Sequence, residues 1–170
     1  MQTGSKQEMN KQENSRQEPL AIRQMTPENQ AQWPVSPEII CDFLHEHLDR
    51  FRDSKQDITR CLNYALGRDE HRRGCVLLAL DAADSTQPKL LGVAVLCETG
   101  MSGYVPENLL VYLAVDSRLR SRGIGKQLMQ QTLSLSKGDV ALHVEPDNPA
   151  RRLYERIGFS NKYLEMRYSK

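Results

Sequence analysis

An apolar run that ends in a glycine-containing turn constrains this chain more than any other segment. The residues Leu113, Ala114 and Val115 are apolar, then come charged residues and the closely spaced Gly123 and Gly125, and apolar residues return at helical spacing. The pattern predicts a strand, a tight turn and a helix. Such a turn suits a phosphate-bearing ligand, because the first N–H groups of a helix lack intrahelical partners and carry partial positive charge.

The composition of the turn supports the same interpretation. Glycine lets the main chain approach an anion with no Cβ in the way, and the nearby arginines and Lys126 add positive charge. The spacing alone is not specific. The Lys-Ser/Thr pair of a P-loop is missing, and Leu128 stands where the dinucleotide fingerprint has its third glycine.

Two segments in this order resemble the GNAT superfamily of N-acetyltransferases. The first, Arg120-Ser-Arg-Gly-Ile-Gly125, is similar to the family's acetyl-CoA pyrophosphate loop, Arg/Gln-x-x-Gly-x-Gly/Ala. The second runs from Asn148 to Phe159 and ends like the family motif Leu-Tyr-x-x-x-Gly-Phe. The close resemblance covers residues 108–160, and the earlier part of the chain matches in element order only.

The resemblance implies an acetyl-CoA site between two strands that splay apart. The pantetheine is expected to pair with the edge of the fourth strand at Leu113, Ala114 and Val115, and Asn148 is a further expected cofactor contact. Asn148 lies six residues before Tyr154, where seven is commoner, and it also suits a helix cap. The residues expected to hold the pyrophosphate are Arg120, Ser121, Arg122, Gly123, Ile124, Gly125 and Lys126.

The same resemblance nominates catalytic residues. Tyr154 is expected near the thioester sulfur, where a phenol can protonate the departing thiolate. The candidate general bases are Glu98, at the end of the third strand, and Glu107, at the start of the fourth, with His143 and Glu145 as alternatives on the fifth. For each carboxylate, a surface position without a catalytic role is the competing interpretation.

Periodicity and turn residues predict a mixed α/β domain with one sheet covered by helices. The resemblance to the GNAT superfamily implies that this sheet is mostly antiparallel, with helices on both faces. The predicted order ends in a single short strand, whereas GNAT proteins usually finish with two antiparallel strands. An alternative is that a partner subunit completes the sheet edge, which makes a homodimer possible. The predicted strands are 20–26, 74–81, 90–97, 109–115, 139–145 and 162–168, and the predicted helices are 36–51, 58–66, 124–137 and 150–157.

Length and composition set limits on function. A chain of 170 residues suits one domain, predicted here as residues 19–170, after a polar, flexible tail at residues 1–18. The net charge of +1 favours neither nucleic acid nor an acidic membrane as a partner. Four scattered cysteines with no metal-ligand spacing predict buried free thiols, no metal site and a reducing cytoplasm. The sequence shows no membrane span or signal peptide.

The sequence therefore predicts an N-acetyltransferase that moves an acetyl group from acetyl-CoA to a primary amine of a small molecule or peptide. Direct attack is expected, because neither motif contains a cysteine that could form an acyl-enzyme. The alternative is a catalytically silent domain that binds an acyl-CoA as a sensor or interaction module. Asp42, Glu46 and Asp49 would suit a cationic acceptor, although a solvated helix face explains them equally well.

Overall fold

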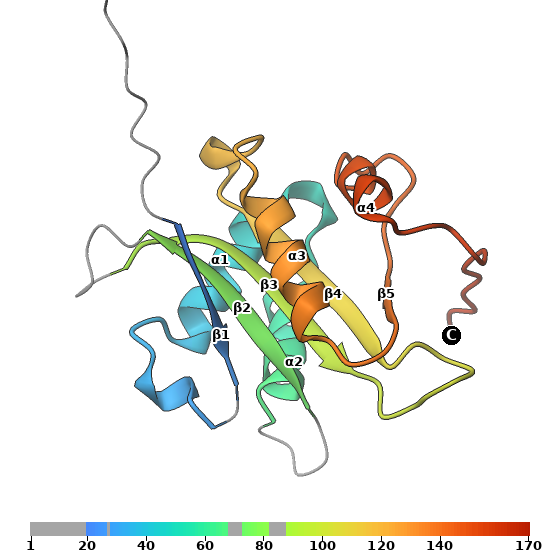
Figure 1. Cartoon of the computed structure of the whole chain (residues 1–170), viewed down its shortest axis with the longest axis horizontal. Coiled ribbons are helices and arrows are strands. Elements are labelled where there is room, and N and C mark those ends of the chain that lie inside the picture. Colours follow the sequence, from blue (N-terminus) through green and yellow to red (C-terminus); the bar gives the residue numbers. More distant parts are fainter. Residues whose placement is uncertain (1–19, 27, 68–72, 82–87) are drawn as a thin grey trace, which may run out of the picture.

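Five strands form a single sheet in the computed structural model, which describes residues 20–26, 28–67, 73–81 and 88–170. The strands lie in the order β1-β2-β3-β4-β5 (Figure 1). Neighbours from β1 to β4 are antiparallel, and β5 runs parallel to β4. The strands are β1 (Leu20–Met25), β2 (Gly74–Asp81), β3 (Leu90–Glu98), β4 (Asn108–Val115) and β5 (Val140–Leu142).

Helices cover both faces of this sheet, as the sequence predicts. The first face carries α1 (Pro37–His47) and α2 (Lys55–Ala65), which bury Leu44 and Leu62 against the sheet. The second face carries α3 (Ile124–Leu135) and α4 (Arg151–Ile157), and there Leu128 is fully buried. Two separate apolar cores result, one on each side of a sheet whose central strands are buried on both faces.

Local signals explain where most of these elements begin and end. Ser36 caps α1 by accepting from the Ile39 N–H, and Ser54 does the same for α2 with Asp57. Gly67, with φ +63°, follows the end of α2. The predicted hairpin between the second and third strands is present as the antiparallel β2–β3 pair, although its loop at residues 82–87 lies outside the described residues, as does the predicted tail.

The strand β4 contains an extra residue and then parts from β5. Leu96 pairs with Leu110 and Val95 pairs with Tyr112, so Val111 is a β-bulge without a partner on β3. The parallel pairing with β5 extends only from Asn108 to Leu110. The expected splay of the fourth and fifth strands therefore begins at the bulge, and the second half of β4 has an edge that no described strand covers.

The structure corrects three boundaries. Helix α1 ends at His47 rather than near residue 51, because Asp49 adopts the left-handed region (φ +53°) and starts a 3₁₀ turn, Asp49–Phe51. Strand β5 keeps only three of its seven expected residues, since the chain leaves β4 after Leu142. Helix α4 begins at Arg151 with Ala150 at the capping position, while the Asn148 side chain accepts from the Ala150 N–H just before it.

The prediction of a last strand at residues 162–168 is wrong. Residues 160–170 contain no strand, and Tyr163, Leu164, Met166 and Tyr168 are 77–93% exposed. The physical reason lies in β5, which spans only Val140–Leu142 and so offers this segment no long edge for pairing. Among the described residues, no helix is long and apolar enough to cross a membrane.

Candidate active site

The open edge of β4 presents main-chain groups at the strand separation. Asp116 donates its N–H to the Leu91 carbonyl on β3. Because main-chain groups alternate in direction along a strand, those of Ala114 also face β3, whereas those of Leu113 and Val115 face away from it. Of the three residues expected to pair with pantetheine, Leu113 and Val115 therefore offer hydrogen-bonding groups, and Ala114 packs its side chain into the α1/α2 core.

The turn between β4 and α3 carries a run of unpaired N–H groups. Within the described part of the chain, no main-chain N–H from Arg120 to Lys126 donates a hydrogen bond, and the first bond of the helix comes from Gln127 to the Gly123 carbonyl. Left-handed φ angles at Ser121 (+66°) and Gly123 (+83°) shape the turn. Unpaired N–H groups at the start of a helix are an arrangement that attracts anions, and the expected binding of the pyrophosphate at this turn stays a prediction.

The two glycines of the turn have different structural roles. Gly123 occupies the left-handed region, and a Cβ there would meet nothing within 4 Å. A Cβ at Gly125 would lie 3.4 Å from Leu153 on α4 and 3.5 Å from Val115 on β4. Gly123 thus leaves space open above the helix start, whereas Gly125 allows α3, α4 and β4 to pack closely.

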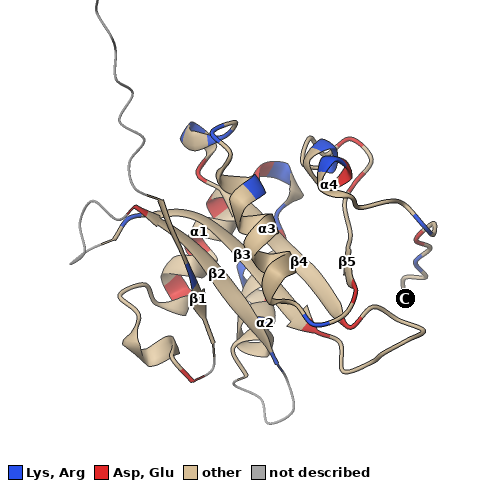
Figure 2. Cartoon of the chain, viewed as in Figure 1, with Lys and Arg blue, Asp and Glu red and all other residues tan. Residues whose placement is uncertain are grey.

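Charged side chains around the turn are already partly engaged. Arg120 pairs with Asp49 (2.6 Å) and donates to the His47 carbonyl (2.6 Å), so its guanidinium is directed toward the end of α1. Arg118 binds the buried carboxylate of Asp116, and this arginine holds the pKa of Asp116 well below its usual range. Figure 2 shows Lys and Arg residues, coloured blue, along this turn and along α4, at the end of the molecule where β4 and β5 separate.

Tyr154 lies on α4, against the α3/α4 face of the sheet. Its side chain is 9% exposed and its ring contacts Phe159 edge to face, with 5.9 Å between the centroids. Burial raises the pKa of Tyr154 to about 12. No residue of the described chain forms a hydrogen bond with its hydroxyl, which therefore remains a protonated donor for a ligand on this face.

A pocket of about 410 Å³ lies on the α1/α2 face of the sheet, beside β4. Helix α2 supplies one wall, the end of β3 supplies the second, and the start of β4 supplies the third. The pocket reaches Val111, which is the bulge where β4 parts from β5. Its lining residues are Arg60, Cys61, Tyr64, Cys97, Glu98, Thr99, Leu109 and Val111.

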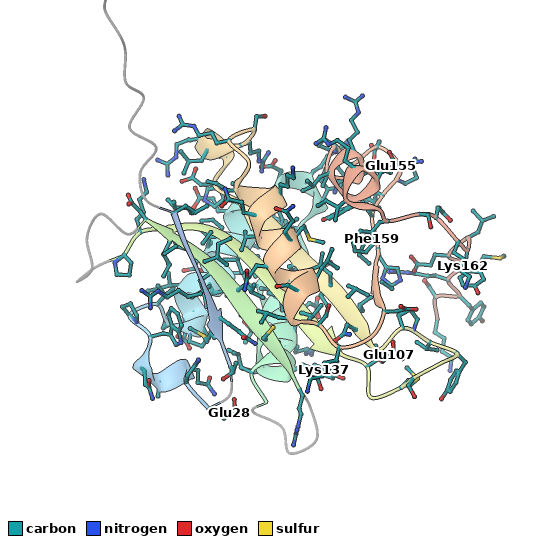
Figure 3. All side chains as sticks on the ribbon, in the orientation of Figure 1. Glu28, Glu107, Lys137, Glu155, Phe159 and Lys162 are labelled. Atoms are coloured by element: carbon teal, nitrogen blue, oxygen red, sulfur yellow. The ribbon has the colours of Figure 1, made fainter. Side chains whose placement is uncertain are left out.

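The two candidate bases occupy different environments. Glu98 is exposed and lines the pocket, and it pairs with Asn108, about two residues or ~7 Å along the strand from the strand separation. Glu107 accepts from the N–H groups of Gly103 and Asp139, which lower its pKa. Figure 3 shows Glu107 at the opposite end of β5 from α4, where β4 and β5 are still paired. Glu98 is therefore the better candidate for the general base, because it lines the pocket, whereas two main-chain N–H groups already bind the Glu107 carboxylate.

Asn148 and its neighbours organise the approach to α4. The Asn148 carbonyl accepts from Arg151, and Asp147 forms an ion pair with Arg50 (2.5 Å), which links the end of α1 to the segment before α4. Asn148 thus uses its side chain within the protein, and its expected cofactor contact stays a prediction. The described residues contain no group of three or more side chains arranged to hold a metal ion.

Sequence reasoning missed the pocket residues on α2. Cys61 lies 3.8 Å from Cys97 through their sulfur atoms, and the Tyr64 hydroxyl donates to the Glu98 carbonyl (2.7 Å). Neither α2 residue belongs to a motif. The one available signal was helical spacing, which places Cys61 and Tyr64 three residues apart and so on one side of α2. All four cysteines are free thiols, and Cys61 is the one that is only partly buried.

The sheet, the strand separation and the turn before α3 define a GNAT-type fold. The chain belongs to the acetyltransferase (GNAT) family, whose model matches residues 27–159. It is therefore an acyltransferase by family, and the reaction of that family is acetyl transfer from acetyl-CoA. A search of curated proteins found no match.

Solved structures share the fold at low sequence identity. An NatC complex bound to Gag peptide and CoA contains a chain with 20% identity and a TM-score of 0.65, covering 85% of this chain and 86% of that one. A probable acetyltransferase has 19% identity and a TM-score of 0.63, with coverages of 88% and 96%. A putative acetyl transferase from Pyrococcus furiosus has 21% identity and a TM-score of 0.57, with coverages of 89% and 100%.

Proposed function

We propose that this protein is an N-acetyltransferase that transfers the acetyl group of acetyl-CoA directly to a primary amine. The observation that carries the proposal is the run of unpaired N–H groups from Arg120 to Lys126, placed beside the open edge of β4. The pyrophosphate binds these N–H groups, and the pantetheine amides pair with Leu113 and Val115 in the manner of an added strand.

In this proposal the donor and the acceptor approach from opposite faces of the sheet. Acetyl-CoA occupies the α3/α4 face with Tyr154, and the amine reaches the thioester from the pocket on the α1/α2 face, through the separation that begins at Val111. The amine nitrogen forms a bond to the thioester carbon, and the C–S bond breaks. One ammonium proton leaves through Glu98 to solvent, and Tyr154 donates a proton to the thiolate and is reprotonated as the amide nitrogen loses its second proton.

A covalent route through a pocket cysteine is disfavoured. Cys61 and Cys97 line the pocket, but the hydrogen bond between their thiols, together with burial, raises the pKa of Cys61 strongly. A thiol with a raised pKa is protonated near neutral pH and is a poor nucleophile. Direct attack by the amine needs no such group.

The test is calorimetric titration of acetyl-CoA into Gly123→Glu and Gly123→Ala. Both variants place a side chain at φ +83° and share that strain, but Gly123→Glu alone adds a negative charge where the pyrophosphate binds. We expect at least a tenfold weaker affinity for Gly123→Glu than for Gly123→Ala. Equal affinities in the two variants would remove the pyrophosphate from this turn.

Thiol release from acetyl-CoA with a broad panel of amines then tests catalysis. Binding of acetyl-CoA with no turnover on any amine would instead support the silent sensor or interaction module. The cytoplasmic location and the homodimer, which the sequence suggests, stay proposals. Light scattering of the full chain tests the homodimer.

A further inference from the structure

The walls of the pocket on the α1/α2 face are mainly apolar. Leu109 and Val111 project from β4, and the thiols of Cys61 and Cys97 face each other across the α2–β3 contact. The raised pKa of Cys61 keeps its thiol uncharged. The Tyr64 hydroxyl donates its hydrogen bond to the Glu98 carbonyl. A polyol or an amino sugar would lose its hydrogen bonds to water here and find few replacements.

The charges around the pocket are sparse. Among its described lining residues Glu98 is the one carboxylate, and Arg60, the one basic side chain, pairs with Asp57 on the same helix (3.0 Å). Two of the three acidic residues that would suit a polycation are engaged elsewhere: Asp42 binds Lys55 (2.7 Å), and Asp49, which follows α1, binds Arg120 (2.6 Å). Within the described part of the chain Glu98 has no ion-pair partner, so it offers one negative charge for one ammonium group.

We infer that the acceptor is a small primary monoamine with an apolar body, bound in the pocket between α2 and the start of β4. The inference rests on the proposed function and names the substrate class of that same site. The apolar body contacts Leu109 and Cys61, the ammonium group loses its proton to Glu98, and the nitrogen attacks the thioester where β4 and β5 separate. A volume of about 410 Å³ is within the range of small-ligand pockets.

The first experiment measures kcat/KM with acetyl-CoA for four amines: 2-phenylethylamine, ethanolamine, spermidine and a peptide with a leucine amino terminus. Each buried CH₂ contributes ~0.8 kcal/mol, or about fourfold, so 2-phenylethylamine should exceed ethanolamine by at least tenfold. It should also exceed spermidine and the peptide. A preference for spermidine would overturn the monoamine, and a tenfold preference for the peptide would overturn the small acceptor, while either result leaves the N-acetyltransferase in place.

The second experiment changes the pocket at Cys61. Cys61→Phe fills the space beside Leu109 and should raise the KM for 2-phenylethylamine at least tenfold, with acetyl-CoA affinity unchanged. Cys61→Ser is the matched control, because it keeps the volume and should change the KM by less than threefold. Leu109→Ala is an independent variant that removes apolar contact and should also raise this KM. An unchanged KM in both Cys61→Phe and Leu109→Ala would overturn the inference that the acceptor binds in this pocket.

Ligand-observed NMR separates failure of the pocket from failure of the proposed function. If no amine is acetylated, the proposed function fails, and binding of 2-phenylethylamine to the CoA complex decides the pocket by itself. Binding that is lost in Cys61→Phe but kept in Cys61→Ser would uphold it. No binding to the unmodified protein would overturn it.

Discussion

In the proposed function Arg120 contacts the pyrophosphate, so we expect Asp49 to compete with the cofactor for this arginine and the removal of its charge to strengthen acetyl-CoA binding. The Arg120 guanidinium now reaches the Asp49 carboxylate and the His47 carbonyl, both at 2.6 Å. Asp49→Asn removes the negative charge and keeps the shape of the side chain. Asparagine also tolerates the left-handed conformation of this position, φ +53°.

The structure sets the size of the expected effects. The two side chains are 44% and 50% exposed, so their ion pair contributes ~0.2–1 kcal/mol to stability and its loss costs no more than that. A hydrogen bond from a guanidinium to a charged acceptor contributes about 1.5–3 kcal/mol, and solvent screening at this exposed position reduces it. A net gain of ~1 kcal/mol corresponds to about fivefold tighter binding.

Calorimetry at low and at moderate salt checks this prediction, since the gain should shrink as salt screens it. Asp42→Asn is the control, because it breaks an exposed ion pair with Lys55 that is not connected to the turn. In a double variant that also carries Arg120→Gln, the gain should disappear. Unchanged or weaker binding by Asp49→Asn, or a gain that persists without Arg120, would refute the competition.

Three further predictions follow from single contacts. Tyr154→Phe should lower kcat at least tenfold with little change in acetyl-CoA affinity, since the ring keeps its packing on Phe159; equal kcat in stopped assays would remove the acid role. The lowered pKa of Asp116 stabilises the fold above the unfolded pKa of ~3.9, and this stabilisation is lost as the pH falls toward the folded pKa. Asp116→Asn should therefore flatten the acid side of a pH–stability curve and cost about 1–3 kcal/mol at neutral pH, and an unchanged slope would contradict this prediction. Gly74→Ala should lower Tm more than Gly92→Ala, because its Cβ would lie 2.2 Å from the Leu96 carbonyl oxygen, whereas the closest contact at Gly92 is 2.9 Å from a side-chain atom; the reverse order in thermal unfolding would show that these contacts relax.

The sequence predicted the layers of the fold well because those layers depend on local patterns. Ser36 before Pro37 located the start of α1, and the apolar runs located the strands β2 to β4. The last strand failed for the opposite reason. Residues 162–168 have a suitable composition, but pairing needs an edge, and the sequence does not show that β5 stops after Leu142.

The candidate site divides in the same way. The turn from Arg120 to Lys126 could be predicted from the sequence, because its conformation depends on Gly123 within it and on the helix that follows. The pocket could not be predicted from the sequence, because it forms where α2 meets two strands that are distant from it along the chain. The direction of Arg120 also depends on Asp49, 71 residues away along the chain, which no motif records.

The extra residue in β4 changes the parity of the strand. Leu109 and Val111 face the pocket, and without the bulge Leu113 would face the same side; instead Tyr112 and Ala114 take that side, and Leu113 packs in the α3/α4 core. Deletion of Val111 would therefore turn every side chain before it to the opposite face of the sheet. In the proposed function, substitutions at Leu109 and Val111 would therefore change the acceptor pocket, while an unchanged number of residues in β4 would keep the main-chain groups of Leu113 and Val115 in place for the cofactor.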